Sequence, residues 1–91
     1  MVIYKYELQI TGIQTVQMPA GAKILSVANQ HGILCLWALV DPVKPKTDRN
    51  IAIFGTDQSI DFGENSFNDK HLFIGTVLKD PFVWHVFEVN E

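Results

Sequence analysis

Three cations lie close together in one short segment of the chain, Lys44, Lys46 and Arg49, a few residues after Trp37. Arginine presents a bidentate fork to phosphate and an aromatic ring presents a face for stacking, so this combination suits a small anion such as a nucleotide. Two prolines stiffen the segment, which reduces the ordering entropy lost on binding. We therefore expect Arg49→Ala to weaken binding of such an anion and to leave folding nearly intact.

A solvated surface loop is the simpler interpretation of the same segment, because Asp41 and Asp48 offset much of its positive charge. We favour that interpretation, but no other segment is a better small-ligand candidate. Trp84 and His85 complete the predicted ligand-binding set as a second aromatic ring and its titratable neighbour. His85 itself is more typical of a half-buried strand histidine bonded to a neighbour than of a general base.

Residue types that support catalysis or metal binding occur without the spacing that those functions need. The three histidines lie singly and far from the one cysteine, so no metal site is predicted. The carboxylates of residues 57–69 lack the alternating ligands and distal glutamate of a calcium loop. Cys35 is flanked by leucines, which is typical of an inert buried thiol. No phosphate loop or serine elbow occurs, and we predict a protein that is not an enzyme and needs no cofactor.

The size and composition of the chain limit its organisation and its partners. Ninety-one residues bury too little surface for two cores, so residues 1–91 are predicted to form a single domain. Hydrophobic residues make up 47% of the chain, more than so small an interior should hold, which indicates a homo-oligomer. The net charge is −3 and only seven residues are Lys or Arg, which argues against duplex nucleic acid as a partner. The lone cysteine, with no signal peptide or membrane-length apolar run, predicts a cytoplasmic protein.

Alternation of apolar and polar residues predicts β-strands and little helix. The clearest half-buried strand covers residues 2–10, and we expect it to form a hairpin with residues 13–18 across Thr11-Gly12. Turn signals recur roughly every ten residues, as in small β folds. The sequence therefore predicts an all-β small sandwich or barrel of about seven mostly antiparallel strands, at residues 2–10, 13–18, 23–29, 33–40, 51–54, 71–78 and 82–89.

The longest apolar run, residues 33–40, carries no charge and lies between turn signals, which is typical of a strand covered on both faces. We expect its alternate side chains to line two faces, Leu34, Leu36, Ala38 and Val40 on one and Cys35, Trp37 and Leu39 on the other.

The connections between strands also carry signals. His31-Gly32 predicts a tight hairpin turn, residues 41–50 predict a surface loop, and residues 79–81 predict the turn of a last hairpin. Residues 57–70 are expected to pack back over one end of the domain. The segments Ile53-Phe-Gly-Thr56 and Phe73-Ile-Gly-Thr76 repeat one pattern and indicate two equivalent strand ends, but the pattern is common and no function is inferred from it.

Motifs along almost the whole chain resemble a family of small uncharacterised proteins encoded by bacteriophages and prophages. They are Tyr4-Lys-Tyr6, Pro19-Ala-Gly-Ala-Lys-Ile-Leu-Ser-Val27, Leu34-Cys-Leu-Trp-Ala-Leu-Val-Asp-Pro42, Phe73-Ile-Gly-Thr76 and Val83-Trp-His-Val-Phe87. The chain departs from that pattern at residues 56–70, where a longer acidic insertion replaces a short glycine-rich turn. The resemblance implies no catalytic residue. It implies a phage accessory protein that acts inside a bacterium.

The leading functional hypothesis is a non-catalytic accessory binding protein that sequesters or blocks a host component in the bacterial cytoplasm. Two targets are open at this point. One is a host protein, bound through an exposed sheet face or the acidic residues 57–69, and the other is a signalling nucleotide held near the cations. The alternative is a small structural or assembly component of the phage particle.

Overall fold

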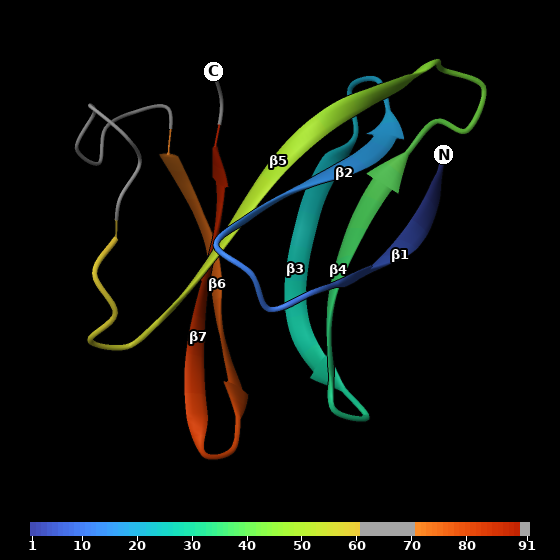
Figure 1. The fold of residues 1–91 in the computed structure, drawn as a ribbon. Coiled ribbons are helices and arrows are strands. Elements are labelled where there is room, and N and C mark those ends of the chain that lie inside the picture. The colour runs from blue at the N-terminus through green and yellow to red at the C-terminus, as the bar shows by residue number, and fades with distance from the viewer. Residues whose placement is uncertain (61–70, 90–91) are drawn as a thin grey trace.

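A computed structural model describes residues 1–60 and 71–89 of the chain and shows two antiparallel sheets packed as a sandwich (Figure 1). The predicted all-β fold is confirmed. The strands are β1 (Val2–Leu8), β2 (Ile13–Pro19), β3 (Lys23–Gln30), β4 (Ile33–Val40), β5 (Lys46–Gly55), β6 (His71–Lys79) and β7 (Phe82–Val89). In the described part of the chain, no helix has the length and hydropathy of a membrane span.

The two sheets mix strands from distant parts of the chain. One sheet has the order β1-β4-β3 and the other has the order β2-β5-β7-β6. Neighbours in sequence pair directly at β3–β4 and β6–β7, whereas β1 pairs with β4 and β2 pairs with β5. The chain therefore crosses from one sheet to the other between β1 and β2, and again between β2 and β3 and between β4 and β5.

The hairpin predicted for the first two strands is wrong, because β1 and β2 belong to different sheets. Leu8 at the end of β1 and Met18 near the end of β2 are both buried in the shared core. Placing these strands in opposite layers buries both apolar faces against each other, which a flat hairpin cannot do. The side chain of Gln14 hydrogen bonds the backbone N–H and C=O of Gln9 and holds the corner between the layers.

Strand β4 supplies much of the core, as its apolar sequence predicts. The four side chains of its inner face are at most 2% exposed: Leu34, Leu36, Ala38 and Val40. On the outer face, Cys35 is buried while Trp37 and Leu39 are half-buried. Lys5 on β1 and Gln30 on β3 flank β4, and Lys5 Nζ donates a hydrogen bond to Gln30 Oε1 at 2.8 Å. This bond crosses the outer face of β4 between Ile33 and Trp37 and covers it there. The strand is thus covered on both faces, fully on one and partly on the other.

The connections that the sequence marked most clearly form as predicted. The turn between β3 and β4 has φ values of 54° at His31 and 87° at Gly32, the left-handed pair that a tight two-residue hairpin requires. The Asn29 side chain accepts a hydrogen bond from the Gly32 N–H at 2.8 Å. The last hairpin, β6 and β7, turns at Asp80-Pro81.

The surface loop predicted for residues 41–50 is half as long as expected, because β5 begins at Lys46. Residues 46–50 pair along β2, from Lys46 opposite Pro19 to Asn50 opposite Thr15. The charged side chains suggested a loop, but a strand at this position has one face towards solvent and the other towards a partner of opposite charge. Residues 61–70, which contain most of the acidic segment expected to pack over the domain, lie outside the described residues.

Strands β3 and β6, one from the edge of each sheet, lie beside each other along one side of the sandwich. They approach closely in the middle, where a Cβ on Gly75 would meet Val27 Cγ2 at 3.0 Å. Farther along, Asn29 Nδ2 donates to the Leu78 carbonyl at 3.2 Å. Near the start of each strand the two edges separate, and the candidate site lies there.

Candidate functional site

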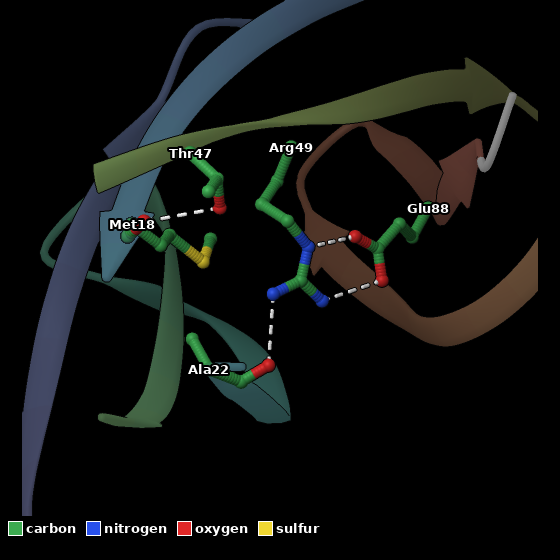
Figure 2. Close-up of polar contacts among 5 residues, drawn as sticks. All are labelled: Met18, Ala22, Thr47, Arg49 and Glu88. Carbon is green, nitrogen blue, oxygen red and sulfur yellow. Dashed lines mark hydrogen bonds and ion pairs between the residues drawn. The ribbon is translucent and has the colours of Figure 1, made fainter. Parts of the chain in front are cut away.

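An ion pair between Arg49 on β5 and Glu88 on β7 lies on the inner face of the four-stranded sheet (Figure 2). Glu88 stands opposite Ile51, two residues from Arg49, so the two side chains are diagonal neighbours on one face. Arg49 Nε donates to Glu88 Oε2, and Nη2 donates to Oε1 at 3.0 Å. Arg49 Nη1 donates to the Ala22 carbonyl at 2.8 Å, just before β3. One guanidinium therefore links the two sheets.

The burial of this pair makes it sensitive to the loss of either partner. The side chain of Arg49 is 21% exposed and that of Glu88 is 8% exposed. The hydrogen bonds that Arg49 donates to Glu88 raise the pKa of Arg49 above its ordinary value, against the opposing effect of burial. The guanidinium therefore stays charged, and the carboxylate beside it neutralises its charge locally.

A pocket of about 430 Å³ lies over the ion pair, between residues 22–25 of the first sheet and residues 72–74 of the second. Each wall contains a β-bulge. Leu25 is the extra residue in β3 and Ile74 is the extra residue in β6. A bulge bends its strand and interrupts pairing, so two bulges facing each other explain why the edges separate at this end.

The rim of the pocket is apolar and accessible. Leu25 and Leu72 are 45% and 49% exposed, although large apolar side chains are usually buried. Phe73 also borders the pocket through its place in β6, but it stands opposite Phe87 on the outer face of the sheet, and its ring packs edge to face against Phe87 there, with centroids 5.4 Å apart. The site is thus a concave surface with half-exposed apolar walls and a neutralised ion pair as its floor.

The structure separates the residues predicted from sequence to bind one ligand. Lys46 and Arg49 are three residues apart on β5, so their side chains leave opposite faces of the sheet. Lys44 lies in the turn before β5, where its N–H donates to the Asp41 carbonyl at 3.1 Å. Of the three cations, Arg49 alone lines the pocket. The placement of Lys46 and Arg49 on a loop is wrong. Because Arg49 bridges the sheets, we now expect Arg49→Ala to destabilise the fold.

The aromatic residues of the predicted site also lie on different faces. Trp37 is on the outer face of β4, opposite Lys5 and Ser26. Trp84 is on the inner face of β7 and contacts the core, with its ring against Phe82 and beside Gly55. Trp84 Nε1 is buried and has no hydrogen-bond partner within the described residues. His85 follows on the outer face of the same strand.

His85 is held by two threonines from the strands on either side of β7. Thr56, directly after β5, lies 2.8 Å from His85 Nε2, and Thr76 of β6 lies 3.2 Å from Nδ1. These threonines end the two Phe/Ile-Gly-Thr repeats, so the repeat marks equivalent positions on two strands that flank one histidine. With both ring nitrogens bonded to hydroxyls, His85 resembles the strand histidine bonded to a neighbour that the sequence favoured.

Comparison with known proteins gives a family without a function. The family described as a domain of unknown function (DUF7352) matches residues 1–91. The chain belongs to this family. No curated protein and no solved structure matches the chain. Within residues 1–60 and 71–89, no three His, Cys, Asp or Glu side chains form a group that could hold a metal ion.

Sequence reasoning missed Glu88 and both bulges, which make the candidate site. The sequence carries a weak signal for Glu88. It stands on the same face of a predicted strand as the apolar residues Trp84 and Val86. A lone carboxylate on an apolar face requires a cation as its partner. The bulges had no signal of this kind, because Leu25 and Ile74 are ordinary strand residues.

Proposed function

We propose that the protein is a non-catalytic binding protein that holds an apolar group of a protein partner in the pocket between β3 and β6. The observation that carries this proposal is the half-exposed apolar rim of Leu25 and Leu72 over the Arg49–Glu88 pair. Protein interfaces centre on apolar and aromatic side chains with charged groups already paired, which describes this surface. Blocking a host protein is the form of the phage-accessory hypothesis that agrees with it.

A nucleotide is the weaker of the two targets. A phosphate beside Arg49 would also approach Glu88, and two like charges about 4 Å apart repel by about 4 kcal/mol at a protein surface. Lys46 projects from the opposite face of β5 and cannot offset that repulsion at the same ligand. The pocket is also open, whereas small-molecule sites usually enclose most of the ligand.

Site-specific photo-crosslinking in a bacterial host tests the proposal. Leu72, which stands opposite Glu88, is replaced by p-benzoylphenylalanine, and the control places the same group at Ile13, which is 53% exposed on β2, at the far edge of the same sheet. We expect a discrete protein adduct from position 72, none from position 13, and loss of the adduct when Leu25→Asp is added. Equal labelling from both positions, or no adduct from either, would contradict the proposal.

A thermal-shift screen with nucleotides separates the two targets. We expect no nucleotide to raise the melting temperature of the wild-type protein. A rise that disappears in Lys44→Ala and Lys46→Ala variants would instead support the nucleotide hypothesis, with the binding site on the cationic segment.

A further inference from the structure

Strand β1 leaves one edge of the three-stranded sheet open. It pairs with β4 on one side, and the described residues place no strand on its other side. The other sheet edges are restricted, since β3 and β6 face each other and β2 ends in Pro19. An edge strand presents unpaired N–H and C=O groups that can pair with another chain.

The first half of β1 lacks the features that usually protect an open edge, and its charges, Lys5 and Glu7, follow on the outer face. Val2, Ile3 and Tyr4 are 43%, 59% and 42% exposed, so apolar groups stand on both faces of the strand. The strand contains no proline, and its pairing with β4 runs without a bulge through all seven residues. An edge strand without a bulge or proline and with exposed apolar side chains is a template for pairing with another strand.

We propose that β1 pairs antiparallel with β1 of a second copy of this chain, with Tyr6 of each copy opposite Tyr6 of the other across a two-fold axis. In this register Lys5 of each copy stands opposite Glu7 of the other, on the outer face of the sheet. The two three-stranded sheets then join into one continuous sheet. The closed two-fold arrangement uses the same edge on both copies and leaves no open β1 edge.

The charges select this register. Centring the axis on Lys5 places two lysines opposite each other, and centring it on Glu7 places two glutamates opposite each other. Like charges directly opposite across strands are destabilising, and opposite charges are stabilising. An axis at Tyr4 places Lys5 opposite Ile3, with no counter-charge. Among the axes that keep both inner faces on one side, Tyr6 alone gives two complementary pairs.

The contacts of the isolated chain permit this arrangement. Lys5 Nζ donates to Gln30 Oε1 at 2.8 Å in an exposed hydrogen bond that a carboxylate can replace with a stronger one. The pocket between β3 and β6 lies beyond the opposite edge of the same sheet, so it stays open in the dimer. The dimer is therefore independent of the proposed binding function.

Charge-swap variants test the interface through sedimentation mass. Wild-type protein at micromolar concentration should have a mass near twice 10.3 kDa. Lys5→Glu alone and Glu7→Lys alone each place like charges opposite each other twice, and each should raise the dimer dissociation constant at least tenfold. An equimolar mixture of the two single variants restores both opposite-charge pairs and should form a heterodimer. The matched control is Lys23→Glu on β3, which should leave the mass unchanged.

Three results would overturn the proposal. The first is a wild-type mass near 10.3 kDa at 100 micromolar. The second is a Lys5→Glu variant that dimerises as strongly as wild type. The third is a mixture of the single variants that stays monomeric although the circular dichroism of each variant matches wild type.

Discussion

The Arg49–Glu88 pair is expected to stabilise the packing of the two sheets, and the stability of a Glu88→Gln variant tests this directly. The substitution keeps the shape of the side chain and removes its charge, leaving a mostly buried guanidinium bonded to the Ala22 carbonyl. Removing one partner of a fully buried pair costs about 3–5 kcal/mol. Because 21% of the Arg49 side chain reaches solvent, we expect a loss of about 2–3 kcal/mol in the free energy of unfolding.

Urea and thermal unfolding, followed by tryptophan fluorescence, measure this loss. In a domain of this size the melting temperature should fall by roughly 10–20 °C. All variants are compared at one protein concentration, because the proposed dimer would make stability concentration-dependent. The matched control is Asp48→Asn on the same strand, where an exposed carboxylate bonded to Gln17 should change stability by about 0.5 kcal/mol or less.

A double-mutant cycle decides whether the two charges act together. Arg49→Met with Glu88→Leu removes both charges and keeps apolar volume, so it should recover most of the stability lost by either single change. The reasoning is refuted if Glu88→Gln costs less than about 1 kcal/mol. It is equally refuted if the two single losses add in the double variant, because additive losses mean that the two side chains do not interact.

Three further predictions concern the core, the contact between β3 and β6, and alkaline pH. Leu36→Asp places an unpaired charge at a fully buried position and should cost several kcal/mol, so a cooperatively folded variant by circular dichroism would contradict the predicted core. Gly75→Ala should lower the free energy of unfolding by about 1–2 kcal/mol, because the added methyl group presses on Val27. The loss should be recovered when Val27→Ala is added and should be smaller for Gly12→Ala, where space is open. Equal losses at both glycines by urea unfolding would contradict this. Burial, and to a smaller extent Tyr4, raises the pKa of Tyr6 above 10.0. The neutral Tyr6 hydroxyl therefore contributes fully to the free energy of unfolding below pH 10.0, and this contribution is lost as the pH rises through the folded-state pKa. Tyr6→Phe should flatten the alkaline fall in stability, and an unchanged pH profile would exclude this cause.

The strand pattern was readable from sequence because it depends on local alternation and turn chemistry. The apolar run of β4, the His31-Gly32 turn and the last hairpin each contain their own signal within a few residues. The placement of β1 and β2 in different sheets has no such local signal, because two adjacent strands with a short link suit a hairpin and a sheet crossing equally well. Only the burial of Leu8 and Met18 in one core decides between them.

The candidate site was less predictable because its residues come from four strands and from the segment just before β3. Arg49 was recognised as important for its charge, but its partner is 39 residues away and its role follows from that contact. Lys46 belongs to the same cluster of charges in the sequence, but its side chain leaves the opposite face of β5 from Arg49 and does not reach the pocket. Charge clustering in sequence therefore indicated one correct residue and grouped it with the wrong neighbours.

The crossing of the chain between sheets also sets the order in which the protein can fold. The hairpins β3–β4 and β6–β7 join residues close in sequence, so they can form early. Pairing of Val2 with Val40 and of Ile13 with Ala52 closes long loops. The loss of chain entropy on closure precedes the stabilising contacts, so these pairings are expected to form later. During synthesis the first two strands have no partner until β4 and β5 have left the ribosome, so the apolar edge of β1 is exposed longest in the nascent chain.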